Sequence, residues 1–184
     1  ALEVMLQGLR DAIQRPDRRQ LSGLKRQDDV LDNLNMAIKA YISSLPAEAM
    51  NDADHRRVAE ILSFATNMEH AGDVVDRGLI GLVGKQVKRG VPFTAEEAAS
   101  LCGVIDRLIG NLRAAASLLV TGDDRAARVL VAEKEAFRTL EADATAAHFE
   151  ALREGRPGAS ALHLDTLRDL KRVNGHVVAA AAYP

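Results

Sequence analysis

Two pairs of carboxylates stand four residues apart in this chain: Glu69 with Asp73, and Asp28 with Asp32. A helix places positions i and i+4 on one face, with their Cβ atoms roughly 5–6 Å apart, so each pair sets two like charges side by side. A bound cation or ample solvent would relieve the repulsion, and hard cations prefer oxygen ligands. From the spacing alone, a solvated acidic face is the simpler account of these four residues, and a site for a hard cation is the alternative.

Three further side chains near these pairs are reserve ligands. Asp29 and Asp76 lie beside the two pairs, and His70 follows Glu69 directly. Consecutive residues of a helix point about 100° apart, so His70 is expected to lie outside the direct set of ligands.

The C-terminal part carries a related pattern with different chemistry. In the stretch Asp169–His176, Lys171 and Gly175 occupy the places that Glu69 and Asp73 hold upstream. Earlier in the same half, Lys134 and Arg138 correspond to the other acidic pair. A set of three cations and a glycine cannot chelate a metal. It would either bind an anion such as phosphate or form internal ion pairs, which is the simpler account, with the nearby acids Glu133, Glu135, Glu141 and Asp169.

Other chemically capable residues form no recognisable catalytic set. The five histidines form no His-x-x-x-His or Glu-x-x-His motif, and we expect His148 and His176 to make polar contacts between helices. No nucleophile elbow, P-loop, GxGxxG or CxxC motif is present.

The single cysteine, Cys102, stands in an apolar helical pattern and is expected in the core. A short basic cluster at 85–89 suits the end of a helix, where cations interact favourably with the helix dipole.

Composition limits the class of protein. The chain has 184 residues, of which 47% are hydrophobic and only 3% aromatic, so one helical domain with an aliphatic core is expected. The net charge of −2 provides no overall attraction to nucleic acid. No segment has the roughly 20 apolar residues that a membrane span needs, and no signal peptide is visible, so the chain as written is expected to be soluble.

Apolar periodicity predicts six helices and no sheet, with Thr94 and Glu97 forming a capping box and the Asn51–Asp54 stretch supplying another N-cap. Four glycines inside the third helix suggest close approach to neighbouring helices. Short connections imply antiparallel neighbours. The predicted helices cover about 2–14, 18–44, 55–88, 94–120, 125–153 and 160–182.

The two halves match in the order and separation of their segments. The stretch at 30–34 parallels 136–140, and the stretch at 67–71 parallels 169–173. An internal duplication of a three-helix unit explains both matches. We therefore predict one domain over 1–184, made of two antiparallel three-helix bundles with half-repeats at about 1–90 and 91–184.

This arrangement resembles the PhoU family. The stretch Met68–Asp73 is similar to that family's Leu-Glu-Arg-Ile-Gly-Asp signature. The stretches at 132–141, followed by His148, and at 169–180 are similar to PhoU-like domains attached to bacterial Na⁺/phosphate cotransporters. The resemblance covers nearly the whole chain, and it departs from the general family pattern where Lys134, Arg138, Lys171 and Gly175 replace the second set of acids.

The resemblance implies a non-enzymatic regulatory domain on the cytoplasmic side of the inner membrane. Its partner would be a transmembrane transporter domain preceding residue 1, with self-association as a further possibility. Acidic motifs of that family can hold iron or zinc clusters. The resemblance thus implies a divalent or iron ion at Asp28, Asp32, Glu69 and Asp73, and makes this as good an account of the four acids as a solvated face. A free-standing PhoU-type regulator acting on a transporter and a sensor kinase in trans is the alternative. A di-metal carboxylate enzyme is a third class, and the missing Glu-x-x-His pairs argue against it.

Overall fold

The chain folds into a bundle of long helices, as described by a computed structural model. The structure describes residues 1–15, 18–46, 50–90, 92–155, 158 and 160–182, and these contain no strand. No helix in these ranges is both long and apolar enough to cross a membrane. The elements are α1 (Leu2–Gln14), α2 (Arg18–Ser43), α3 (Asp52–Asp73), η2 (Val74–Ile80), α4 (Gly81–Arg89), α5 (Ala95–Thr121), α6 (Asp124–Arg153) and α7 (Ala161–Ala182).

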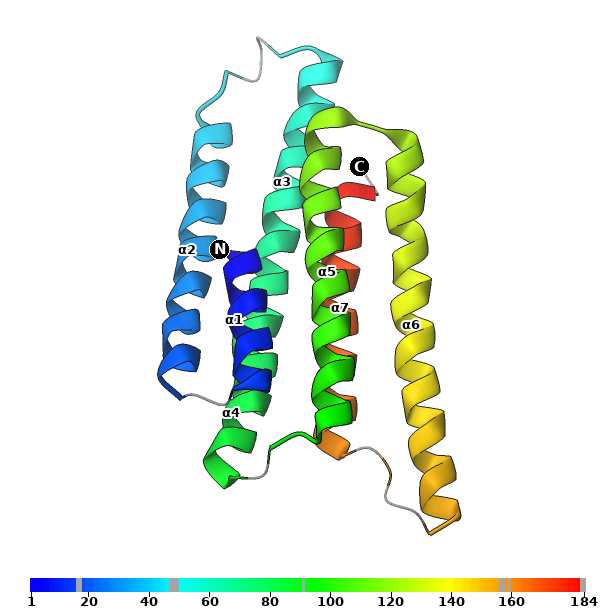
Figure 1. Ribbon diagram of the computed structural model, residues 1–184. Helices are drawn as coiled ribbons and strands as arrows, with labels where there is room; N and C mark the ends of the chain where they lie inside the picture. Colours follow the sequence, from blue (N-terminus) through cyan, green and yellow to red (C-terminus); the bar gives the residue numbers. More distant parts are fainter. Residues whose placement is uncertain (16–17, 47–49, 91, 156–157, 159, 183–184) are drawn as a thin grey trace.

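These elements form six rods. The elements α3, η2 and α4 follow one another without a break and together make the third rod. Each successive rod reverses direction, so neighbours in sequence run antiparallel (Figure 1). The prediction of an all-α bundle of six helices is confirmed, and the observed ends fall within a few residues of the predicted ones. The predicted break at Pro16 and Asp17 lies outside the described residues.

Local capping explains where several helices begin. The Asn51 side chain accepts hydrogen bonds from the Ala53 and Asp54 amides, and the Asp54 carboxylate accepts one from the Asn51 amide. Thr94 and Glu97 form the predicted capping box at the start of α5. Both boxes satisfy backbone donors that the first turn of a helix leaves free.

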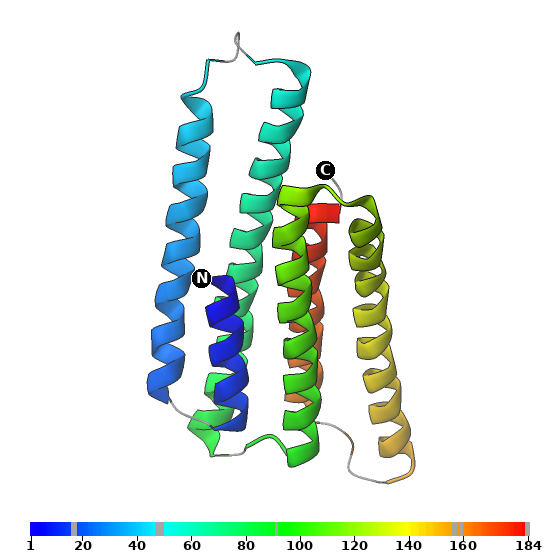
Figure 2. The same ribbon diagram turned by 45° about the horizontal axis from the view of Figure 1, so that its top comes forward.

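The rods pack as two groups of three. α2 packs against α1 and α3, while α7 packs against both α5 and α6. The groups meet where α7 contacts α3 and where α1 contacts α5, and Figure 2 shows the rods lying side by side along a common direction. This places the two halves face to face along α3 and α7. The duplication that would relate them stays a prediction.

The core is aliphatic, as composition predicted. Leu6, Leu108 and Leu170 are fully buried, and Cys102 is 4% exposed within the same cluster. Phe137 is the large aromatic side chain that joins them, at 1% exposure. Burial of this kind is the main source of stability for a bundle built from amphipathic helices.

The third rod contains a feature that periodicity did not predict. Residues Val74–Ile80 form a π-helix, which is rare and is often found at functional sites. Its buried residues Val74 and Leu79 are five apart, as are Val75 and Ile80. That spacing suits a helix with i to i+5 hydrogen bonds. The π-helix thus changes which residues of the rod face α2 and α7.

Candidate functional site

An acidic cluster forms where α2 lies against the end of α3 and η2. Asp28 is the central member. Burial raises the pKa of the Asp28 carboxyl to about 6, from an ordinary value of 3.8. The Arg77 guanidinium opposes this rise in pKa, and three nearby negative charges add to it. They belong to Asp32, Asp73 and Asp76, which with Asp28 make up what we call the acidic cluster.

Gly72 allows the two helices to come this close. A Cβ atom at position 72 would lie 2.5 Å from Leu31 Cδ1 and 2.9 Å from Asp28 Oδ1. Those separations are too short for a contact between a Cβ atom and another heavy atom. The glycine therefore leaves the space that the Leu31 and Asp28 side chains fill. The predicted close approach is confirmed at this position.

Two oxygens of the acidic cluster are buried without a hydrogen-bond partner. They are Asp28 Oδ1 and Asp76 Oδ1. Buried carboxylate oxygens are normally satisfied, since leaving one unpaired costs about 1–3 kcal/mol or more. A bound cation or a water molecule beside each oxygen would satisfy it.

The predicted ligand set is only partly brought together. Asp32, Asp73 and the reserve residue Asp76 each lie close enough to Asp28 for their charges to raise its pKa. The carboxylate of Glu69 instead lies 3.5 Å from His70 Nε2, and Asp73 makes a 3.0 Å ion pair with Arg77. Asp29 is exposed on α2. Within the described ranges, no three His, Cys, Asp or Glu side chains converge closely enough to hold a metal ion.

In the second half, the predicted cations Lys171 and Arg138 form internal ion pairs. Lys171 Nζ lies 2.9 Å from Glu141 Oε2, and Arg138 Nε lies 2.9 Å from Glu135 Oε2. The internal-pairing interpretation is confirmed for these two residues. Gly175 lies on α7, where an added Cβ would meet open space.

A buried polar network joins the helices of the second half. Asn174 is fully buried and accepts a 2.9 Å hydrogen bond from Asn111 Nδ2. Its own Nδ2 donates to the Glu133 carbonyl. Glu133 receives two hydrogen bonds from Arg107, which lower the pKa of the Glu133 carboxyl. This network links α5, α6 and α7 and serves packing.

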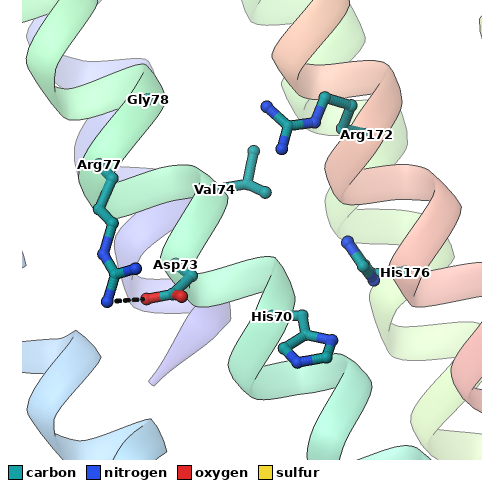
Figure 3. Close-up of a pocket in the computed structure, with 7 residues that line it drawn as sticks. All are labelled: His70, Asp73, Val74, Arg77, Gly78, Arg172 and His176. Atoms are coloured by element: carbon teal, nitrogen blue, oxygen red, sulfur yellow. Dashed lines mark ion pairs between the residues drawn. The ribbon is translucent and has the colours of Figure 1, made fainter.

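A pocket opens between the third rod and α7, next to the acidic cluster. It has a volume of about 390 Å³. Figure 3 shows Arg172 and His176 on one helix, facing His70 and Val74 on the other. The remaining lining residues are Asp73, Arg77 and Gly78.

Sequence reasoning did not identify this pocket, although it named His70 and His176 individually. The His70 and His176 rings lie 5.5 Å apart between centroids, in an edge-to-face arrangement. His176 Nδ1 lies 3.2 Å from Asn67 Oδ1, which confirms the predicted polar contact between helices. Burial lowers the pKa of His176, and the charges of His70 and Arg172 lower it further. More than 90 residues separate the two sides, so no local spacing pattern could reveal the pocket.

Comparison with known proteins shows which family the chain is similar to. Residues 1–77 match the family model described as the PhoU domain. The chain is 33% identical over 177 residues to the "Putative inorganic phosphate export protein YjbB" of Salmonella typhimurium, and 31% identical to the protein of that name in Escherichia coli K12. Each alignment covers 95% of this chain and 32% of the relative, so the chain spans about a third of the length of these curated relatives. No solved structure matches significantly. The sequence of residues 1–77 is therefore similar to the PhoU domain, and the described residues of the chain form an all-α bundle.

Proposed function

We propose that this chain is a non-enzymatic regulatory domain of a phosphate transport protein. The observation that carries the proposal is the similarity of 95% of the chain to proteins named "Putative inorganic phosphate export protein YjbB". The match of residues 1–77 to the PhoU domain supports the same role. The domain would act by packing against the transporter and changing the balance between its states.

The proposed partner is the membrane domain of a Na⁺/phosphate cotransporter, encoded before residue 1. The relatives are about three times as long as the aligned region, which leaves room for such a domain. This regulatory domain would then lie on the cytoplasmic side of the membrane. The alternative is a free-standing PhoU-type protein that restrains a transporter and a sensor kinase in trans.

A divalent or iron ion at the acidic cluster is part of the proposal. Two buried, unpartnered carboxylate oxygens and the raised pKa of Asp28 support it. Asp28, Asp32 and Asp73 would supply oxygen ligands, with Asp76 as a further donor. Glu69 would have to turn away from His70 to join them. Because the acids do not converge in the described part of the chain, ion binding would draw α2 and the third rod closer together.

Removal of the domain from the full-length transporter tests the proposed role. Membrane vesicles containing the intact or the truncated protein would be loaded with labelled phosphate, and the flux would be followed over time. We expect the truncated protein to keep transporting phosphate at an altered rate, because the domain regulates the transport step without performing it. A full-length protein with a protease site between the two parts, assayed before and after cleavage, provides the matched control.

Three results would change this proposal. Identical flux from the intact and truncated proteins would contradict a regulatory role. Restoration of normal flux by adding the separately expressed domain to the truncated protein would favour the alternative that acts in trans. Metal-dependent oxidase activity from the purified domain would contradict the non-enzymatic assignment.

A further inference from the structure

The pocket between the third rod and α7 gathers side chains suited to an anion. Arg172 and His176 approach from α7 and His70 from the third rod, while Arg77 also lines the pocket but is turned toward Asp73 and away from α7 (Figure 3). The volume of about 390 Å³ is ample for a tetrahedral oxyanion and bound water. One carboxylate, Asp73, also lines the pocket. Figure 3 shows it directed toward Arg77 and away from both histidines, and the 3.0 Å ion pair balances its charge.

Arg172 is held in place while keeping donors available. Its Nη1 donates a 3.1 Å hydrogen bond to Asp169 Oδ1, and the Asp169 side chain is 11% exposed. The guanidinium group carries five N–H donors in a planar fork that matches phosphate oxygens, so this bond leaves donors for a second acceptor. The Arg172 side chain is 58% exposed, so a ligand from solvent can reach it.

Gly78 allows Asp169 to take this anchoring position. A Cβ at position 78 would lie 2.6 Å from Asp169 Oδ2. Gly78 belongs to the π-helix η2, whose residues Val74 and Arg77 also line the pocket. The π-helix therefore shapes the wall of the pocket opposite α7.

The hydrogen bonds around His176 assign its tautomer. Asn67 Nδ2 donates to the Ser63 carbonyl at 2.9 Å, which turns the Asn67 oxygen toward His176 Nδ1. An oxygen acceptor at that position requires the neutral ring to carry its proton on Nδ1. Nε2 of His176 is then a hydrogen-bond acceptor. His70 has a half-exposed side chain and adds a second imidazole to the pocket.

A pocket with both a guanidinium donor and an imidazole acceptor suits an oxyanion that carries a proton. Hydrogen phosphate offers oxygens to Arg172 and a P–OH group to His176 Nε2. Sulfate at neutral pH has no proton to donate, so it would leave the acceptor unpaired. Buried or partly buried groups left unpaired are the usual basis of strong discrimination between similar ligands.

We propose that this pocket binds a protonated phosphate-type oxyanion, held by Arg172, His176 and His70. The ligand is either free inorganic phosphate or a phosphomonoester group, which has a second pKa near 6 and therefore keeps a P–OH proton in a large fraction of molecules only at about pH 6 and below. The inference deepens the proposed function and rests on it for the choice of phosphate as the physiological ion. It places the ligand between the two halves of the bundle, where binding would tighten the contact between α3 and α7.

Calorimetric titration of the purified 184-residue domain with inorganic phosphate, phenyl phosphate and sulfate tests the proposal. The titrations are made at about pH 6, where both phosphate ligands retain a P–OH proton to a large extent and sulfate has none. We expect phosphate to bind at least about tenfold more tightly than sulfate, the change that loss of one charge-assisted hydrogen bond produces. Arg172→Lys keeps the positive charge but removes the planar guanidinium donors. This substitution should weaken phosphate binding about tenfold. His70→Gln should weaken it by a smaller factor.

Two matched controls lie on the same helices outside the pocket. Arg168→Lys changes a second arginine of α7 that also pairs with an acid three residues earlier. His55→Gln changes an exposed histidine of α3. Both controls should bind phosphate like the unchanged protein, and circular dichroism would verify that every variant is folded.

The outcomes separate the two sources of the phosphate group. Preference for inorganic phosphate indicates a free-ion site, whereas preference for phenyl phosphate indicates a phosphorylated partner, and either result supports the proposed ligand class. Absence of phosphate binding, equal affinity for sulfate, or equal weakening by Arg172→Lys and Arg168→Lys would overturn it. If the domain binds no phosphate while its removal still alters transport, the inference fails and the regulatory function stands.

Discussion

Asp28 holds its carboxyl between two helices, beside three other acids. Its pKa of about 6 lies above the ordinary 3.8, so the folded chain binds the proton more tightly than the unfolded chain does. The corresponding stability is fully present below about pH 4 and is lost as the pH rises through about 6. At neutral pH the ionised Asp28 therefore destabilises the fold.

The substitution Asp28→Asn should remove this loss of folding stability at neutral pH, when it is measured in metal-free protein. The full pKa shift corresponds to roughly 3 kcal/mol, and solvent near the half-buried carboxyl reduces this to about 1–2 kcal/mol. We expect the variant to be more stable by that amount at about pH 7.5 and little changed at about pH 4. Urea denaturation in the presence of a chelator, at several pH values, measures the difference.

The matched control for this variant is Asp29→Asn, because Asp29 is exposed on the same helix. It should change stability by less than about 0.5 kcal/mol at any of these pH values. An equal gain in stability from both variants would show that general charge repulsion, and not the position of Asp28, sets the pH dependence.

At the scale of helices, Gly72 sets the distance between α2 and α3. Gly72→Ala would place a methyl group 2.5 Å from Leu31 Cδ1. Overpacking of this kind costs about 1–3 kcal/mol, which exceeds the gain of up to ~1 kcal/mol in helix propensity. We expect a net loss of stability and a lower midpoint in thermal unfolding.

Gly110→Ala is the matched comparison, in the middle of α5. An added Cβ there meets no atom within 4 Å, so only helix propensity applies. The substitution should stabilise the fold by about 0.5–1 kcal/mol. If both alanine variants gained stability, the α2–α3 contact would be more adaptable than the structure indicates.

The network around Asn174 gives a second test at this scale. Asn174→Ala removes a fully buried amide and leaves Asn111 with one fewer partner. Unsatisfied buried groups cost about 1–3 kcal/mol each, and the small cavity adds to that cost. We expect a loss of about 2–4 kcal/mol in chemical denaturation. Asn33→Ala, at an exposed position of α2, should be nearly neutral.

At the scale of the whole molecule, an ion at the acidic cluster would couple the two longest rods of the first half. A ligand that binds only the folded state stabilises it by about 2.7 kcal/mol at a concentration roughly 100 times its Kd. We therefore expect divalent cations to raise the thermal midpoint and a chelator to lower it. Elemental analysis of gently purified protein would identify the ion.

The variant Asp28→Asn combined with Asp32→Asn separates specific binding from general screening. This double variant should show no rise in thermal midpoint when divalent cations are added, while Asp29→Asn should still show the rise. A shift of the same size in both proteins would assign the effect to surface charge. An absence of both bound metal and thermal shift would favour the solvated acidic face.

Much of the architecture is determined by local sequence. The six rods follow from apolar periodicity, and caps such as Asn51 and Thr94 define where helices begin, because these signals depend on residues within one or two turns. The carboxylate spacing likewise predicted that Asp28 and Asp73 would share a face with other acids. Burial of Cys102 and the ion pair of Arg138 with Glu135 also follow from neighbouring residues, whereas Lys171 pairs with Glu141 of another helix.

Only the tertiary structure decided which side chains meet between rods. The π-helix η2 belongs to the segment that brings Asp76 beside Asp28, while Glu69 pairs with His70. The pocket joins His70 to Arg172 and His176 across more than 100 residues, and it depends on how α7 packs against the third rod. Helical spacing specifies which residues share a face. The partner of that face is set by packing between distant segments, for which a single sequence carries no local signal.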